Sequence, residues 1–207
     1  MTAADEPPTP TPAASRPRVL FLHGLEGRPD GAKGRALAAH CDVCAPALDT
    51  SAARELAQRH GLSSLSAVRQ RVPESESALE QALRRPLEQT SAALEAAGSI
   101  DVAVGSSFGG ALLLELIHRG HWDGPSLFLA QAGRALLPDN RWLPKQLRAL
   151  LVHGTADDVV PIEGSRELFS RAGDRCQLWE VHDAHPLAQF TAVGGLERAV
   201  HALHVQS

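Results

Sequence analysis

Short apolar runs alternate with helical patterns along most of this chain, and the alternation limits the fold more than any other feature. The clearest run covers residues 19–23 and stops at Gly24, as is typical of a strand buried on both faces. Further strands are expected at residues 42–48, 101–105, 126–130, 148–153 and 177–181. The alternation predicts an α/β fold with a mostly parallel central sheet of about six strands and helices on both faces.

Helical patterns occupy the intervals between these runs, at residues 32–40, 52–60, 108–117, 163–172 and 186–204. The interval between residues 50 and 98 is longer than a simple crossover needs. Within it Leu79, Leu83 and Leu87 keep helical spacing, but Pro86 falls inside the pattern. Because proline disrupts a helix interior and is favoured at a helix start, we expect a break or a new helix there.

The 207 residues suit a single domain of ordinary composition. Residues 1–17 contain no apolar stretch, so we predict a disordered N-terminal segment followed by one domain at residues 18–207. This segment does not resemble a signal or transit peptide, which favours a cytoplasmic location. A net charge of −4, no basic stripe and no apolar run of membrane-spanning length argue against nucleic-acid and membrane partners. The oligomeric state is left open.

The cysteines and the scattered histidines do not form a recognisable metal or redox motif. Cys41, Cys44 and Cys176 are too few for a disulfide framework, and we interpret them as free thiols in or near the core. His118 and His121 have no cysteine or carboxylate cluster beside them, so we interpret them as surface residues. No nucleotide-binding glycine motif is present either. We therefore expect no metal and no other cofactor.

The turn after the third predicted strand carries a G-x-S-x-G segment with Ser107 at its centre. A serine between a strand and a helix stands on a sharp turn with its hydroxyl projecting. Gly105 and Gly109 allow that turn, because side chains there would crowd the backbone. Taken alone, Ser107 fits a helix N-cap as well as a nucleophile. Its neighbour Ser106 is the other candidate, but only Ser107 lies midway between the glycines.

Three further segments each follow a predicted strand: residues 21–25, 153–161 and 181–186. Because the carboxyl ends of parallel strands meet at one edge of a sheet, we expect these segments to lie beside Ser107. In the first, a backbone N–H after His23 and Gly24 could bind an oxyanion together with the N–H of Phe108. The side chain of His23 itself is expected to brace this loop by hydrogen bonding.

The other two segments offer the acid and the base that a nucleophilic serine needs. Segment 153–161 contains Asp157 and Asp158, and segment 181–186 contains His182 and His185. The chain order is therefore serine, aspartate, histidine.

At this point the chain resembles the α/β-hydrolase superfamily, whose triad has the same order. Residues 22–24 resemble its oxyanion segment, residues 105–109 its nucleophile elbow, and residues 153–161 the acid-bearing loop of many of its esterases. The resemblance extends from about residue 19 to the C-terminus. Residues 21–29, with Lys33, also loosely resemble small bacterial esterases whose pattern is Leu-His-Gly-Phe-Asn-Ser-Ser-Pro followed by a lysine. Here Leu-Glu-Gly-Arg replaces the middle four residues.

The resemblance implies a serine hydrolase that needs no cofactor. Ser107 would attack an acyl carbonyl, His185 would transfer the proton, and Asp157 would orient the imidazole. The family pattern favours His185 over His182, and the spacing to Val160-Pro161 favours Asp157 over Asp158.

The backbone N–H groups of Leu25 and Phe108 would bind the oxyanion. The expected substrate is a small or medium acyl ester, which would make the protein a carboxylesterase. A thioesterase or an amidase or peptidase would use the same triad, and a non-catalytic binding protein of the same fold is the alternative from another class.

The specificity pocket is weakly marked in the sequence. Residues 131–146 are too few for the large lid of many lipases, so no large lid is expected. Trp142 in this segment is a candidate either for lining the pocket or for anchoring a packed loop. The helices expected between residues 49 and 87 could instead cover part of the cleft.

Overall fold

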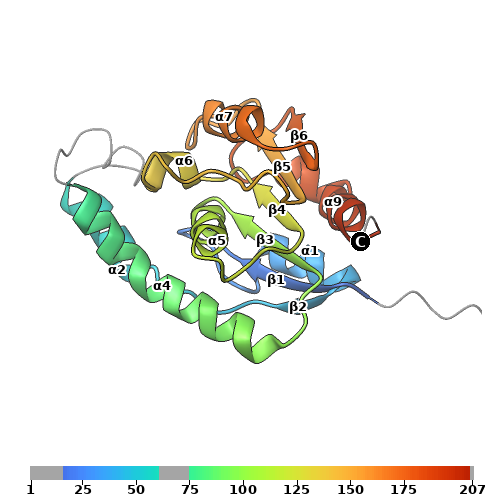
Figure 1. Cartoon of the computed structure of the whole chain (residues 1–207), viewed down its shortest axis with the longest axis horizontal. Coiled ribbons are helices and arrows are strands. Elements are labelled where there is room, and N and C mark those ends of the chain that lie inside the picture. The colour runs from blue at the N-terminus through green and yellow to red at the C-terminus, as the bar shows by residue number, and fades with distance from the viewer. Residues whose placement is uncertain (1–15, 61–74, 206–207) are drawn as a thin grey trace, which may run out of the picture.

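The structure, a computed structural model, describes residues 16–60 and 75–205. Its strands form one sheet: β1 (Arg18–Leu22), β2 (Asp42–Cys44), β3 (Val102–Ser106), β4 (Ser126–Leu129), β5 (Ala149–Gly154) and β6 (Cys176–Val181). They pair in the order β2-β1-β3-β4-β5-β6, and every pair is parallel. The predicted six-stranded parallel sheet is therefore confirmed (Figure 1).

The direction of the strand order reverses between β1 and β3, because the chain first adds β2 on one side of β1 and then builds all later strands on the other. Leu22 pairs with Gly105, so the ends of β1 and β3 lie side by side. Gly154 at the end of β5 likewise pairs with Val181 at the end of β6. Ligand sites of open parallel sheets lie at the carboxyl ends of strands near such a reversal.

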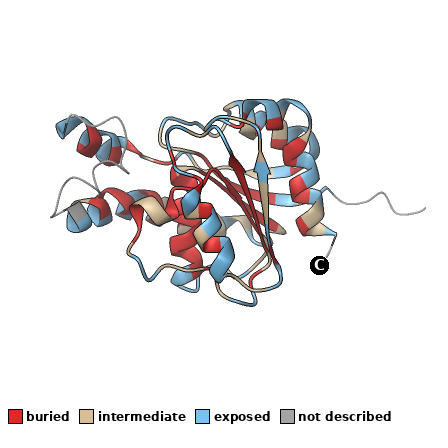
Figure 2. Cartoon of the chain, turned by 90° about the horizontal axis from the view of Figure 1, so that it is seen from above, coloured by how far each residue is buried: buried red, intermediate tan, exposed pale blue. Residues whose placement is uncertain are grey.

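Helices cover both faces of the sheet: α1 (Ala32–His40), α2 (Ser51–Arg59), α4 (Ser75–Ala97), α5 (Phe108–His118), α6 (Gly133–Leu136), α7 (Glu163–Arg171), α8 (Ala188–Ala192) and α9 (Gly195–His204). Side chains alternate along each strand, so β1 sends Leu20 and Leu22 to one face and Val19 and Phe21 to the other. The first face packs against α2, α4, α5, α6 and α7, and the second against α1, α8 and α9. Figure 2 shows the buried strands between these two layers.

Three predicted boundaries are wrong, each for a local reason. Helix α4 runs through Pro86 without a break, because Leu79, Leu83 and Leu87 are all buried and their packing outweighs a cost of about 3 kcal/mol for an interior proline. Strand β2 ends at Cys44, since Pro46 has no N–H to pair with β1.

The helix expected at residues 186–204 is two helices, α8 and α9, separated at Gly194. That glycine has a φ of 73°, which a continuous right-handed helix does not accommodate. The short helix α6 has no counterpart in the prediction.

The thiols have the environments expected of them. All three cysteines are free, with Cys41 and Cys176 buried and Cys44 partly buried. Burial raises the pKa of the Cys176 thiol to about 11, so it stays protonated at neutral pH. The interpretation as free thiols in or near the core is confirmed.

The predicted disordered segment falls mostly outside the described residues, which begin at Arg16. The Arg16 guanidinium donates to the carbonyls of Ala38 and Cys41 near the end of α1. None of the helices in the described residues is both long and apolar enough to cross a bilayer.

Candidate active site

Ser107 occupies a strained turn between β3 and α5. Its φ of 54° and ψ of −113° lie in a region that residues with a side chain rarely adopt. Neighbouring strands hold the turn: the Ser107 N–H donates to the Leu129 carbonyl at 2.8 Å, and the Ala132 N–H donates to the Ser107 carbonyl at 3.1 Å. A Cβ on Gly109 would overlap the carbonyl of Leu22, so only glycine lets α5 begin this close to β1.

The structure brings Ser107, His185 and Asp157 together in one hydrogen-bonded chain. His185 Nε2 lies 3.0 Å from Ser107 Oγ, and His185 Nδ1 lies 2.8 Å from Asp157 Oδ2. A carboxylate can only accept, so Nδ1 carries the proton and Nε2 is free to accept from the serine hydroxyl. The strands β3, β5 and β6 end at the same edge of the sheet, which is why segments about 80 residues apart meet there.

Asp157 is held as an anion although its side chain has no exposed surface. Burial alone would raise the pKa of this carboxyl group. Hydrogen bonds from His153, His185 and the N–H groups of Val160 and Val159 lower the pKa by more, to well below its ordinary 3.8. The carboxylate is therefore charged and fully bonded at neutral pH, which fixes both its position and the tautomer of His185.

A second histidine on Asp157 is the feature that sequence reasoning missed. His153, which is completely buried, places Nε2 at 3.1 Å from Asp157 Oδ2 and 3.0 Å from the Val160 carbonyl. Both neighbours are acceptors, so this nitrogen carries the proton, and Nδ1 accepts from the Ser165 hydroxyl at 2.7 Å. The only signal in the sequence was that His153 lies four residues before Asp157, at the end of a predicted strand.

The network continues from Ser165 to the turn beside Ser107. Gln131 Nε2 donates to Ser165 Oγ at 3.1 Å, and the Gly133 N–H donates to Gln131 Oε1 at 2.7 Å. Because Ala132 bonds to the Ser107 carbonyl, the acid and the serine are linked through buried polar groups. Gln131, Ser165 and His153 have at most about 1 % of their surface exposed, so each of these bonds is shielded from water.

The alternative candidates lie outside this arrangement. Asp158 and His182 are exposed, and Ser106 is buried at the end of β3. Of the candidates that the sequence offered, Ser107 and Asp157 are thus the two that hydrogen-bond to His185.

The loop after β1 lies against Ser107, and His23 braces it as expected. His23 Nε2 accepts from the Leu48 N–H at 3.1 Å, so Nδ1 carries the proton and donates to the Gly24 carbonyl at 2.8 Å. A Cβ added to Gly24 would lie only 3.4 Å from the Cβ of Ser107. The next residue is Leu25, and Phe108 is the first residue of α5, whose N–H has no partner within the helix.

A cleft of about 590 Å³ opens over these groups, a size typical of small-molecule sites. Its walls include Leu25, Phe108, Leu136, Val160 and Lys33.

Lys33 ties helix α1 to the loop of His185. Its Nζ donates to the Pro186 carbonyl at 2.6 Å. Burial lowers the pKa of Lys33, while the nearby charge of Asp183 partly offsets the shift.

Trp142 does not line this cleft; instead it anchors its loop. The guanidinium groups of Arg134 and Arg171 both lie 4.0 Å from the centre of its ring, so the indole makes cation–π contacts with two cations. The described residues also contain no cluster of three His, Cys, Asp or Glu side chains that could hold a metal ion.

Solved structures share this arrangement of sheet and helices. A protein from Xanthomonas campestris assigned to the alpha/beta hydrolase superfamily aligns over 93% of this chain and 99% of its own, with a TM-score of 0.64 and 19% identity. A dienelactone hydrolase from Anabaena variabilis aligns over 92% and 86%, with a TM-score of 0.58 and 15% identity. Est1E from Butyrivibrio proteoclasticus, solved with ferulic acid bound, aligns over 92% and 90%, with a TM-score of 0.57 and 14% identity.

These likenesses show that the chain has the α/β-hydrolase fold, as its resemblance implied. No family model and no curated protein sequence matches the chain.

Proposed function

We propose that this protein is a serine hydrolase, a carboxylesterase that cleaves small or medium acyl esters. The observation that carries the proposal is the hydrogen-bonded chain from Ser107 through His185 to the buried Asp157 carboxylate. A serine on a strained strand-to-helix turn, at the edge of a cleft, is how this fold presents a nucleophile. The hydrolases among its structural neighbours agree with this chemistry.

In the proposed reaction, Ser107 Oγ attacks the ester carbonyl carbon while His185 Nε2 takes the hydroxyl proton. The negative charge that develops on the carbonyl oxygen would be bound by the N–H groups of Leu25 and Phe108. His185 then gives its proton to the departing alcohol, and the acyl group stays on the serine. Water attacks this acyl-enzyme, His185 takes a proton from the water and returns it to Ser107, and the carboxylic acid leaves.

Asp157 would act throughout as the fixed negative partner of His185. It stabilises the imidazolium that forms when His185 is protonated, and it keeps the tautomer that exposes a basic Nε2 to the serine. No residue in this scheme calls for a metal ion or an organic cofactor.

Fluorophosphonate labelling followed by intact-mass analysis tests the nucleophile. One adduct is expected on the native protein and none on Ser107→Ala, while the neighbouring Ser106→Ala should still be labelled. An adduct that survives in Ser107→Ala would contradict the assignment.

A panel of esters, thioesters and anilides of matched acyl groups tests the reaction class. Highest kcat/KM is expected for the esters. A preference for thioesters or anilides would move the protein to the thioesterase or amidase class with the triad intact. Labelling failure together with no turnover on any of them would leave only the binding-protein alternative.

A further inference from the structure

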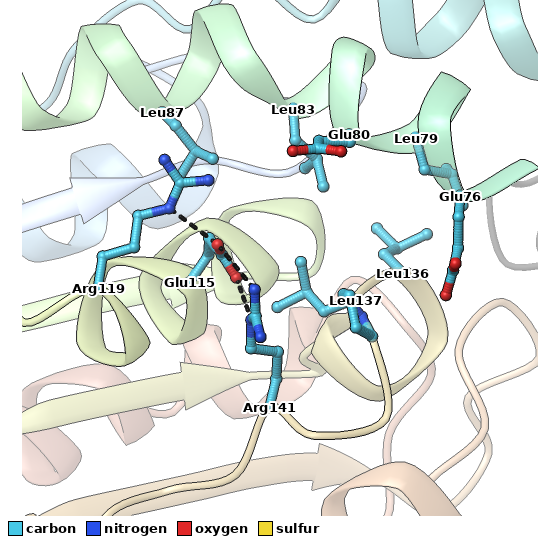
Figure 3. Close-up of a pocket in the computed structure, with 11 residues that line it drawn as sticks. Glu76, Leu79, Glu80, Leu83, Leu87, Glu115, Arg119, Leu136, Leu137 and Arg141 are labelled. Atoms are coloured by element: carbon cyan, nitrogen blue, oxygen red, sulfur yellow. Dashed lines mark hydrogen bonds and ion pairs between the residues drawn. The ribbon is translucent and has the colours of Figure 1, made fainter.

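A second pocket of about 200 Å³ lies next to the cleft, between α4, α5 and the segment that follows α6. We call it the leucine groove, because five leucines line it: Leu79, Leu83, Leu87, Leu136 and Leu137. Figure 3 shows the leucines of α4 facing those of the α6 segment across this space. No step of the proposed reaction uses it.

Leu136 is the wall that the groove shares with the cleft. It lines both, whereas Leu83 and Leu137 line only the groove, and Ser107 and Ala132 line only the cleft. Leu136 is the last residue of the short helix α6, whose first turn begins directly after Ala132. Among the described residues, Leu136 is thus the only one that lines both pockets.

A cluster of charged side chains lies at one end of the groove. Glu115 is buried there and accepts from Arg119 Nε at 2.8 Å and from Arg141 Nε at 2.7 Å (Figure 3). Burial alone would raise the pKa of Glu115, but the bonds from the two guanidinium groups lower it, so the carboxylate is ionised and fully paired. Breaking this buried ion cluster would cost free energy, because a buried charge would lose its partner. A methyl or methylene group makes no favourable polar contact with it.

A third pocket meets the cleft at Lys33. The pocket beyond Lys33 shares Gly24, Gly27 and Lys33 with the cleft and includes Arg28, but its lining contains no leucine. The extension past Leu136 is lined by five leucines, by the exposed side chains of Glu76 and Glu80 and by the Glu115 cluster, whereas the extension past Lys33 carries Lys33 and Arg28. An ester placed on Ser107 has two arms, and a hydrocarbon acyl arm would gain affinity by being buried against the leucines.

We infer that the leucine groove is the acyl-chain subsite, and that Leu136 is the residue that sets which chain lengths enter it. The occupant is the unbranched hydrocarbon chain of the ester, and the inference rests on the proposed function. Each methylene buried in such a groove should raise kcat/KM roughly fourfold until the chain reaches the Glu115 cluster. The preferred substrates are then medium-chain esters rather than acetates.

Nitrophenyl esters with acetyl, butyryl, octanoyl and dodecanoyl chains test this inference in two variants. Leu83→Trp fills the groove without lining the cleft, so the octanoyl-to-acetyl ratio of kcat/KM should fall at least tenfold. Leu136→Ala removes the wall, so the ratio of dodecanoyl to octanoyl should rise several-fold. Leu94→Trp, on the same helix but outside the groove, is the matched control and should leave both ratios at the native value.

Unchanged ratios in both Leu83→Trp and Leu136→Ala would overturn the inference while leaving the hydrolase proposal standing. If Leu83→Trp fails to unfold cooperatively on heating, Leu136→Ala alone decides the outcome. If the native protein turns over no ester, calorimetry with octanoate on Ser107→Ala decides it instead. If Ser107→Ala binds octanoate and the added Leu83→Trp substitution weakens that binding tenfold, the subsite is supported although the hydrolase proposal has failed. If octanoate does not bind at all, both proposals are overturned.

Discussion

The carboxyl edge of the sheet, where we propose catalysis and which we call the catalytic edge, lies next to the leucine groove, but the two are stabilised by different interactions. At the edge, Ser107, His185 and Asp157 hold their positions through directional hydrogen bonds at 2.8–3.0 Å. In the groove, the leucines of α4 and the α6 segment are positioned by packing, and directional bonds hold the Glu115 cluster at one end. The difference suggests that almost any substitution at the edge abolishes activity. Substitutions in the groove should leave activity in place and change the preferred acyl-chain length.

Backbone strain also differs between the catalytic edge and the leucine groove. Among the described residues, three non-glycine residues have a positive φ, namely Ser107, Ala130 and Leu187, at 54°, 45° and 51°. All three lie in the loops that follow strands at the carboxyl edge of the sheet. Neither α4 nor α5, the two helices that line the groove, contains a residue with a positive φ, so backbone strain of this kind is concentrated where the chemistry is proposed.

The largest loss is expected from His185→Ala, which removes the proton-transferring group. We expect kcat to fall about 10⁵-fold, because a triad without its base keeps only binding and oxyanion stabilisation. Stopped assays on the best ester measure the loss. His182→Ala, three residues away on the exposed surface, is the control and should stay within twofold of the native rate; an equal loss in both variants would contradict the assignment of the base.

Asp157→Asn should reduce kcat by about 10⁴-fold, because the amide can present its N–H to His185 and select the wrong tautomer. The fold should survive, since the side chain keeps its shape and its two backbone bonds at one oxygen. Asp158→Asn is the matched control, with no loss expected. A similar loss in Asp158→Asn would mean that the loop as a whole, and not the carboxylate of Asp157, supports turnover.

Asp157→Asn also gives a prediction for how the stability of the fold depends on pH. The pKa of Asp157 is lower in the folded protein than its ordinary 3.8, so ionisation favours the folded state above that pH. This contribution is lost as the pH falls below about 4. The free energy of unfolding of the native protein, measured with denaturant, should therefore converge on that of Asp157→Asn as the solution is acidified. A difference that stays constant from neutral pH down to pH 3 would show that the carboxylate is not preferentially ionised in the fold.

The sequence predicts which segments meet at the carboxyl edge of the sheet, but it does not predict the leucine groove, for a physical reason. Ser107, Asp157 and His185 each belong to a short segment that follows a strand, and the parallel sheet brings all such segments to one edge. The leucine groove depends on how α4 packs, and Pro86 even led us to expect a break in that helix. Leu136 lies on a helix of four residues that carries no periodic signal. His153 was visible in the same motif as Asp157, but its partners Ser165 and Gln131 come from other elements.

A smaller loss is expected from His153→Leu, which removes one of the two imidazole donors to Asp157. A hydrogen bond to a charged group contributes about 1.5–3 kcal/mol, so kcat should fall roughly tenfold to a hundredfold. The free energy of unfolding should fall too, because Ser165 and Gln131 lose part of their network. His153→Gln, which can still donate, should restore part of the rate.

Thr90→Val is the control that distinguishes a loss of rate caused by a misplaced Asp157 from one caused by a less stable fold. Thr90 is as buried as His153 and donates to the Pro86 carbonyl at 2.7 Å, but it lies outside the site. It should lower the free energy of unfolding without lowering kcat or shifting its pH profile. If His153→Leu behaves in the same way, the second histidine only stabilises the fold, and the catalytic edge depends on fewer contacts than we infer.

The smallest effect is expected from Lys33→Met, which cuts the tie between α1 and the His185 loop. A single hydrogen bond contributes about 0.5–1.5 kcal/mol, so kcat/KM should fall roughly twofold to tenfold. Because Lys33 lines the cleft but not the leucine groove, the octanoyl-to-acetyl ratio should not follow the loss. Lys145→Met, which removes an equivalent lysine-to-carbonyl bond far from the cleft, is the control. A changed octanoyl-to-acetyl ratio in Lys33→Met would mean that the acyl chain of the ester lies beside Lys33 and not in the leucine groove, which would contradict the subsite assignment.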